Sequence, residues 1–290
     1  MSIKVGVVGS INLDLVASGV PLPRAGETVT GAQFAQHPGG KGANQALAAR
    51  RLGAEVAMIG CVGDDTLAEP AMALLREDGV DVSAVMSEIG TTTGVALIAV
   101  SPEGENQITV ASGANLRVSA QDAADLEGVD IVLCQLEVPV SAVEAAVRRA
   151  REVGAKSVVN LAPAIAVPDA LLEIADILIV NEIEAAFYGD ALHQGDGWVI
   201  VTLGKAGVVL YASGTERARV PAFDVDVVDT TGAGDTFCGA LAVAIGEEMS
   251  PEAALRFASA AAALAVTRAG AQPSLPTRAK LDAFLKAQSE

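Results

Sequence analysis

The part of this sequence best suited to chemistry is a glycine-rich turn that ends in a carboxylate. Residues 228–237 read VDTTGAGDTF and run into an Ala-rich stretch that is predicted to form a helix. Glycines let backbone N–H groups approach a phosphate, and a helix N-terminus favours the phosphate's negative charge. The turn therefore predicts an anion hole with Asp235 beside it as a base. The alternative for an isolated Gly-x-Gly-Asp is that the Asp only caps its helix.

A second group of polar residues lies near the N-terminus. Residues 39–44 read GGKGAN at a loop-to-helix junction, where glycine backbone can approach a polyol and Asn44 can both donate and accept. Asn12 and Asp14 follow the first strand-like run, at the end where open α/β sheets bind ligands. The alternative for residues 39–44 is a flexible turn. The alternative for Asn12 and Asp14 is a surface turn.

Several common sites are excluded by spacing. Residues 6–10, GVVGS, resemble a dinucleotide loop, but the G-x-G-x-x-G spacing is absent and no helix is expected to follow. The sequence contains no G-x-x-x-x-G-K-[ST] loop. With two histidines and no C-x-x-C pair, a typical zinc site cannot be assembled. Acid–base chemistry therefore falls to carboxylates.

Charge favours a small-molecule partner. The 290 residues carry a formal net charge of -17 at pH 7, which opposes binding to nucleic acid or to anionic membranes. An anionic substrate such as ATP would need local positive potential from metal ions, helix N-termini and a few lysines.

Hydropathy and cysteine usage indicate a cytoplasmic protein. The chain is 51% hydrophobic and can bury a large core, but no apolar run approaches the roughly 18 residues of a membrane span. The N-terminus enters a strand-like run without a signal-peptide layout. Cys61, Cys134 and Cys238 are far apart in sequence and are typical of buried, reduced thiols.

The elements that must position these residues alternate between strand and helix. Strand-like apolar runs cover residues 3–8, 56–61, 130–135, 157–161, 176–180 and 198–202. Helical spacing of apolar residues covers 43–52, 141–153, 251–265 and 277–287. This alternation predicts an α/β fold with a doubly wound, mostly parallel sheet flanked by helices.

Two stretches depart from this alternation. Residues 26–36 and 91–111 alternate like antiparallel strands, and the second turns at residues 102–105. They predict a small β-sheet lid, formed by segments near 15–38 and 91–112. No repeat, low-complexity tract or linker divides the sequence, so residues 1–290 are expected to form a single domain.

Taken together, these segments resemble the ribokinase family of carbohydrate kinases over nearly the whole chain. The resemblance is carried by GSINLD (9–14), GETVTG (26–31), GGKGANQA (39–46), GENQITVASGAN (104–115), QLEVP (135–139), NEIEA (181–185), TLGKAGV (202–208), DTTGAGDTF (229–237) and AVTRAGAQPS (265–274). GGKGAN and DTTGAGD in this order are far more specific than either motif alone. The resemblance implies a ribokinase-like fold and ATP-dependent phosphorylation of the 5-hydroxyl of D-ribose.

The resemblance also implies roles for individual residues. Asp235 would accept the proton of the sugar's primary hydroxyl as that oxygen attacks the γ-phosphorus, with the anion hole formed by Gly232, Ala233 and Gly234. The sugar would be bound by Asp235 and by Asn12, Asp14, Gly40, Lys41, Asn44 and Glu137. Ionised carboxylates hold sugar hydroxyls more firmly than neutral side chains do.

Nucleotide and cation sites are implied in the same way. ATP would be bound by Asn181, Thr202, Gly204, Gly207 and Gly234. Glu184 matches the N-x-x-E element that such kinases use to hold Mg²⁺ through water, although a helix-surface Glu is the alternative. A K⁺ site beside the anion hole would comprise Asp229, Thr231, Ala265, Arg268, Gly270 and Ser274, most of them acting through backbone carbonyls.

The family further implies a homodimer in which the lids pair and cover each other's edges. One segment departs from the family pattern: only residues 187–197, FYGDALHQGDG, separate the segment after Asn181 from the next strand. This predicts that a peripheral helix is missing and puts the outer wall of the nucleotide site in question.

Three other interpretations stay open at this point. The first is a kinase of the same fold acting on deoxyribose, another sugar such as fructose, or a nucleoside. The second is a non-catalytic sugar-binding or regulatory protein. Loss of the base Asp235 or of the anion-hole glycines would mark such a protein, but this sequence retains both the base and the glycines. The third is a Rossmann dehydrogenase, which failure to bind nicotinamide cofactors would exclude.

Overall fold

A nine-stranded sheet forms the framework of the protein in the computed structural model, which describes residues 2–288. In spatial order its strands are β13 (Thr215–Val220), β12 (Val208–Ala212), β11 (Trp198–Thr202), β10 (Ile177–Asn181), β9 (Lys156–Asn160), β8 (Ile131–Gln135), β1 (Lys4–Val8), β4 (Glu55–Gly63) and β5 (Val85–Glu88). The pairings from β5 to β11 are parallel, and β12 and β13 add an antiparallel edge.

The central strands are buried on both faces, which is why they appear in the sequence as continuous apolar runs. Successive side chains point to opposite faces of a strand. In β8, Leu133 therefore belongs to the hydrophobic core on one face of the sheet, while Val132 belongs to the core on the other. Each face needs its own layer of helices.

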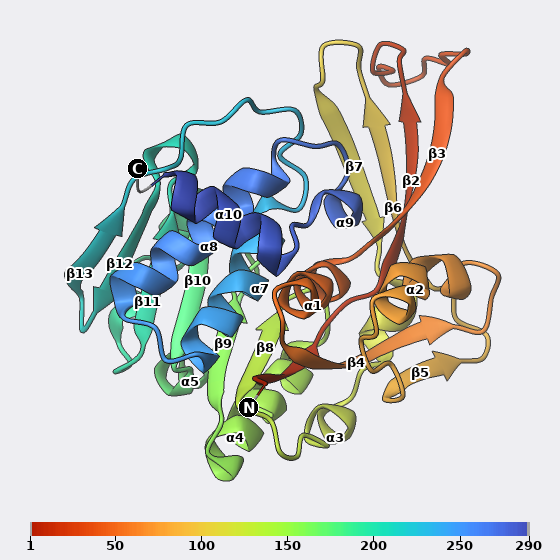
Figure 1. Ribbon diagram of the computed structural model, residues 1–290. Helices are drawn as coiled ribbons and strands as arrows, with labels where there is room; N and C mark the ends of the chain where they lie inside the picture. The colour runs from red at the N-terminus through yellow and green to blue at the C-terminus, as the bar shows by residue number, and fades with distance from the viewer. Residues whose placement is uncertain (1, 289–290) are drawn as a thin grey trace.

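Helices cover both faces of the large sheet (Figure 1). On one face lie α1 (Lys41–Arg51), α2 (Ala68–Glu77), α7 (Ala233–Gly246), α8 (Pro251–Ala265), α9 (Ala271–Ser274) and α10 (Arg278–Ala287). On the other lie α3 (Ala120–Ala123), α4 (Val140–Val153), α5 (Asp169–Ile174) and α6 (Glu182–Tyr188). Three 3-10 turns complete the fold: η1 (Gly113–Arg117), η2 (Gly189–His193) and η3 (Gly204–Ala206). The predicted α/β fold class is confirmed.

A smaller sheet projects from the body of the molecule (Figure 1). Its strands, in spatial order, are β3 (Gln33–Gly39), β2 (Asn12–Ser18), β6 (Gly94–Val100) and β7 (Asn106–Ala111). The outer pairs are antiparallel, whereas β2 and β6 in the middle are parallel. Alternation of apolar residues predicts such strands but does not distinguish their directions, because both kinds of pairing share a period of two.

Two details of this sheet differ from the sequence prediction. The strand expected from residue 26 begins only at Gln33, because Gly26 and Gly31 adopt φ angles of 82° and 92°, which an extended strand cannot contain. Asn12–Ser18, which was open to interpretation as a turn, is a strand.

The short segment before β11 lacks a long helix. After α6, only the 3-10 turn η2 intervenes before the chain enters β11. Within residues 2–288, no helix combines the length and the apolar character that a membrane crossing requires.

Candidate active site

Polar side chains gather where the parallel strands end. Gln135, Asn160, Asn181 and Thr202 are the last residues of four neighbouring strands, β8 to β11. From β1 the chain continues to β4 on one side and later to β8 on the other, so the strand order reverses beside β1. Open α/β sheets bind their ligands in the crevice at such a reversal.

Asp235 lies in the first turn of α7, close to this crevice. Gly232 precedes the helix with φ 76°, and a Cβ there would lie 3.0 Å from the Ala271 Cβ, so the turn requires glycine. Asp235 is only 8% exposed. Its Oδ2 accepts from Asn44 Nδ2 at 2.9 Å and its Oδ1 from Gln45 Nε2 at 3.0 Å, so α1 holds the carboxylate. The side chain does not cap its own helix.

Two further buried amides lie behind Gln45. Gln45 Nε2 also donates to Asn160 Oδ1 at 3.2 Å, and Gln135 Nε2 donates to Gln45 Oε1 at 2.9 Å. Gln45, Gln135 and Asn160 are absent from the predicted site. The available signal was Gln45 itself, a polar residue on the buried face of an otherwise Ala-rich helix.

Three carboxylates lie near enough to Lys41 to affect its pKa. The negative charge of Asp235 raises the pKa of Lys41, with Glu137 and Glu184 adding to the effect although burial opposes it. Burial, with the charges of Glu137 and Asp235 adding to its effect, raises the pKa of Asp14 to about 6. The cluster is therefore built to meet a ligand that supplies several hydrogen-bond donors.

Glu137 and Asn12 are held in fixed orientations. Glu137 Oε2 accepts from Ser10 Oγ at 2.5 Å and from the Lys41 backbone N–H at 3.1 Å. Asn12 Oδ1 accepts from Asn115 Nδ2 at 2.7 Å. Gly40, with φ 90°, packs so closely that a Cβ would lie 2.8 Å from the Asn12 backbone nitrogen. The predicted sugar-binding residues are thus brought together, and Ser10 and Asn115 join them.

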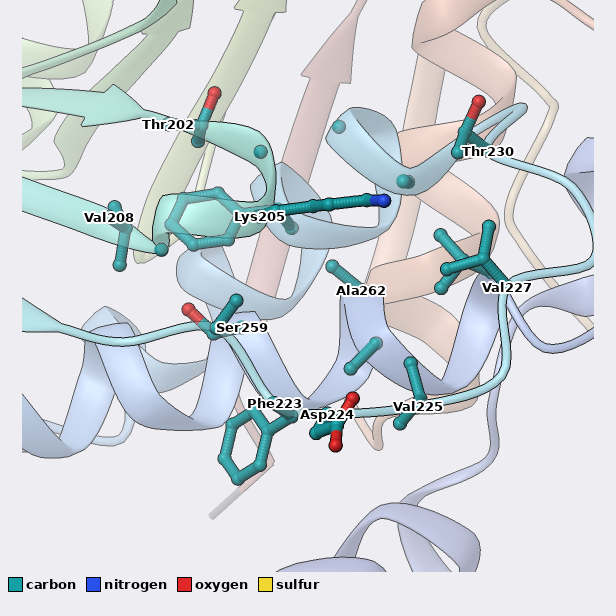
Figure 2. A pocket seen from close by; sticks show the side chains of 18 of the residues that line it. Thr202, Lys205, Val208, Phe223, Asp224, Val225, Val227, Thr230, Ser259 and Ala262 are labelled. Carbon is teal, nitrogen blue, oxygen red and sulfur yellow. The ribbon is translucent and has the colours of Figure 1, made fainter.

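A cavity of about 720 Å³ reaches Ala233 and Gly234 from the other side (Figure 2). The walls come from segments 202–208, 222–237 and 259–266, and they include the predicted nucleotide residues Thr202, Gly204, Gly207 and Gly234. Figure 2 shows Lys205 extending into the cavity, with Phe223, Asp224 and Val225 along the opposite wall. The shortened segment 187–197, which is fully described, supplies none of the lining residues.

Asn181 and Glu184 form a reciprocal cap at the start of α6. Asn181 Oδ1 accepts from the Glu184 N–H at 2.9 Å, and Glu184 Oε2 accepts from the Asn181 N–H at 2.8 Å. Asn181 is the register partner of Thr202, which lines the cavity. Glu184 is 7% exposed, unlike a surface helix Glu, and burial raises its pKa while the Asn181 N–H and Lys41 counteract the rise.

The residues predicted to bind K⁺ lie on two adjoining segments, the loop before α7 and the stretch from the end of α8 through α9. Asp229 accepts from Thr231 N and Oγ1 at 2.9 and 2.6 Å, and from the Gly270 N–H at 2.8 Å. Burial opposes ionisation, yet these hydrogen bonds lower the pKa of Asp229. Ala265 O accepts from the Arg268 N–H, and Ser274 Oγ donates to Ala271 O. Asp229 therefore joins the loop before α7 to the segment that runs from the last residue of α8, Ala265, to the last residue of α9, Ser274.

The fold and site define an α/β enzyme in which a polar crevice and a large cavity meet at a helix N-terminus suited to phosphate. Residues 2–278 match the family described as pfkB family carbohydrate kinase. Ribokinase from Haemophilus influenzae is 40% identical, with 97% of each chain covered.

Two solved structures are also similar. Ribokinase from Thermotoga maritima superimposes with a TM-score of 0.88 at 34% identity, covering 98% of this chain and 99% of that one. Arabidopsis thaliana ribokinase complexed with ribose and ATP gives 0.88 at 32% identity, covering 99% of both. The chain belongs to the pfkB family of carbohydrate kinases, and the resemblance inferred from the motifs is confirmed.

Proposed function

We propose that the protein transfers the γ-phosphoryl group of ATP to the 5-hydroxyl of D-ribose, giving ribose 5-phosphate and ADP. The observation that carries the proposal is the position of Asp235 at the N-terminus of α7. On one side are Asp14, Lys41 and Glu137, and on the other is the cavity that reaches Ala233 and Gly234. The relatives named above, one of them complexed with ribose and ATP, support the choice of substrates. A panel of pentoses and hexoses assayed for ADP release tests it, and ribose should give the highest kcat/KM.

In the proposed reaction the sugar lies against the charged side chains of Asp14, Glu137 and Lys41 and the amides of Asn12 and Asn44. Its 5-hydroxyl lies at Asp235. The hydroxyl oxygen forms a bond to the γ-phosphorus, its proton passes to an Asp235 carboxylate oxygen, and the bond from the γ-phosphorus to the β,γ-bridging oxygen breaks to release ADP. The N–H groups at Gly232, Ala233 and Gly234 would stabilise charge on the transferring group. Gly234 has open space around it, so a phosphate can approach its backbone.

ATP would occupy the 720 Å³ cavity, beside Thr202, Gly204, Gly207 and Gly234. Asn181 is not part of the cavity lining but is paired with Thr202 on the neighbouring strand. Glu184 fits a magnesium site because one carboxylate oxygen is fixed by the Asn181 N–H, while the other accepts no hydrogen bond from residues 2–288. Held there through water, Mg²⁺ would neutralise phosphate charge.

A monovalent cation site is also proposed at the loops around Asp229. The lowered pKa keeps this carboxylate charged, and Thr231 and Gly270 already fix its geometry. A bound K⁺ would add positive charge beside the anion hole.

Activity is therefore expected to be higher in K⁺ than in a bulky organic cation at equal ionic strength. Initial rates of ADP release in the two chloride salts measure this. Asp229→Asn should remove most of the difference, because its neutral amide cannot supply the negative charge. Equal rates of the wild-type enzyme in both salts would count against the site.

A homodimer through the small sheet is proposed as well. This sheet leaves apolar side chains exposed on both faces, Phe34 (67%) and Leu97 (52%) on one and Ile108 (54%) and Val110 (47%) on the other. Its outer strands, β3 and β7, have free edges in the described chain, and a second copy could cover both the edges and the apolar surface.

Sedimentation equilibrium at micromolar concentration should give twice the monomer mass of 29.2 kDa. The double variant Phe34→Glu, Leu97→Glu should shift the equilibrium to monomer, because charges placed on this surface oppose its burial. A wild-type monomer under these conditions would contradict the proposal.

We also propose a cytoplasmic location. Cys61, Cys134 and Cys238 are free and buried, and burial raises the pKa of Cys134 to about 12. Unpaired buried thiols of this kind are typical of a reducing compartment.

A further inference from the structure

A chain of buried amides lies directly behind Asp235. Gln45 and Gln135 are completely inaccessible to solvent, and Asn160 is 8% exposed. Each comes from a different element: Gln45 from α1, and Gln135 and Asn160 from the ends of the paired strands β8 and β9, where they are register partners. The sheet is thereby connected through α1 to the carboxylate at the start of α7.

The hydrogen bonds along this chain have one consistent direction. Asn160 Nδ2 donates to the backbone carbonyl of Ile179 at 3.3 Å, which leaves Asn160 Oδ1 to accept from Gln45 Nε2. Gln135 Nε2 donates to Gln45 Oε1, so both ends of the Gln45 amide are committed. A backbone carbonyl cannot exchange roles, so it fixes the orientation of the amides that follow.

The orientation of Gln45 matters because an amide can present either a donor or an acceptor. If it were reversed, Gln45 Oε1 would face Asp235 Oδ1 and Asn160 Oδ1, while its Nε2 would face the Gln135 donor. Three attractive contacts would become three repulsive ones, in a site from which water is excluded. Asn160 therefore orients Gln45 so that it presents an N–H to Asp235, and Gln135 holds the other end of the same amide by donating to its oxygen.

We propose that Gln45 is a positioning residue for the Asp235 base, and that Gln135 acts through Gln45. The inference rests on the proposed function of Asp235. One carboxylate oxygen is held by Asn44 and the other by Gln45, so the plane of the base is fixed from both sides. Neither amide can take up a proton, so the proton from the sugar goes to a remaining lone pair of Asp235.

The backbone at Gln45 is fixed as well. A Cβ on Gly239 of α7 would lie 2.6 Å from the Gln45 carbonyl oxygen, so α1 and α7 touch here without an intervening side chain. The amide and the carboxylate thus belong to two helices in backbone contact. Geometry of this kind matters to catalysis because a displacement of about 1 Å can cost on the order of 10²-fold in rate.

A double-mutant cycle on kcat tests the proposal, with Gln45→Met, Gln135→Met and the combination. Methionine keeps the length of glutamine and removes the amide. Gln45→Met should lower kcat roughly ten- to a hundredfold, with Gln135→Met lowering it less. If Gln135 acts through Gln45, the double variant should match Gln45→Met within about twofold. The ribose Kd, measured by calorimetry, should change less than about threefold, because none of these amides is proposed to touch the sugar.

Ser157→Ala is the matched control. Ser157 is 1% exposed on the same strand as Asn160, and its hydroxyl hydrogen-bonds Asp176 at the far end of the sheet. Its loss should lower the thermal midpoint of unfolding and leave kcat unchanged. A purely structural role for Gln45 and Gln135 would give the same pattern and would overturn the proposal.

Additive effects of Gln45→Met and Gln135→Met on kcat would also overturn it. Failure of the proposed function gives a different result, namely wild-type ribose turnover that persists in Asp235→Asn. Loss of turnover in Asp235→Asn together with an additive cycle would therefore refute only the role of the amide chain.

Discussion

Asp235→Asn is expected to lower kcat by about 10²- to 10⁴-fold, the usual contribution of a positioned general base. Asparagine has the shape of aspartate but cannot accept the proton of the attacking hydroxyl. Its oxygen can still accept from Asn44 or Gln45, so ribose affinity should change less than about threefold. Single-turnover rates of ADP formation, together with calorimetric ribose binding, measure the two effects separately.

The control for this variant is Asp190→Asn, the same substitution at an exposed position on the 3-10 turn η2. It should have wild-type kinetics. Near-wild-type turnover of Asp235→Asn would instead exclude the proposed role of this carboxylate and would favour a binding or regulatory protein of the same fold.

The large sheet could be predicted from the sequence because its strands are buried on both faces and its helices have one apolar face. The predicted helices 141–153 and 251–265 differ from α4 and α8 by at most one residue. The small sheet was harder. Asn12–Ser18 begins with Asn12 and Asp14, residue types that are depleted in strands and common in turns, so it was open to interpretation as a turn.

The site could be predicted only as far as its motifs extend. Asp14, Lys41 and Asp235 lie in segments specific enough to name, and the structure brings them together. Gln45 and Gln135 also lie in quoted segments, 39–46 and 135–139, but the motifs do not show that they pair, because the contacts of the amide chain join residues separated by 190, 115 and 90 positions. A buried Gln is readily identified from sequence as part of a helix or strand, but its partner is decided by tertiary packing.

Asp14→Ala is expected to lower kcat/KM for ribose by about 10²-fold and to narrow the difference between ribose and 2-deoxyribose. In the proposed complex Asp14 accepts from a secondary hydroxyl of the sugar. Removing that hydroxyl leaves a partly buried carboxylate unpaired, which costs roughly 1–3 kcal/mol. The wild-type enzyme should therefore prefer ribose by at least about tenfold, since about 1.4 kcal/mol corresponds to tenfold.

The pH dependence gives this prediction a second readout. Burial, with the charges of Glu137 and Asp235, raises the pKa of Asp14 to about 6, so the carboxylate is mostly ionised at pH 7.5 and mostly protonated at pH 5. A protonated carboxyl accepts more weakly from a hydroxyl, so wild-type kcat/KM for ribose should fall as the pH drops through about 6. Asp14→Asn keeps an acceptor oxygen without a titrating proton, and its kcat/KM should fall less over this range.

Two results would show that Asp14 does not recognise the secondary hydroxyl of the sugar. One is equal kcat/KM of the wild-type enzyme for 2-deoxyribose and ribose, and the other is unchanged ribose kinetics in Asp14→Ala. The preferred substrate would then be a deoxy sugar, another sugar or a nucleoside, with Asp235 still available as the base.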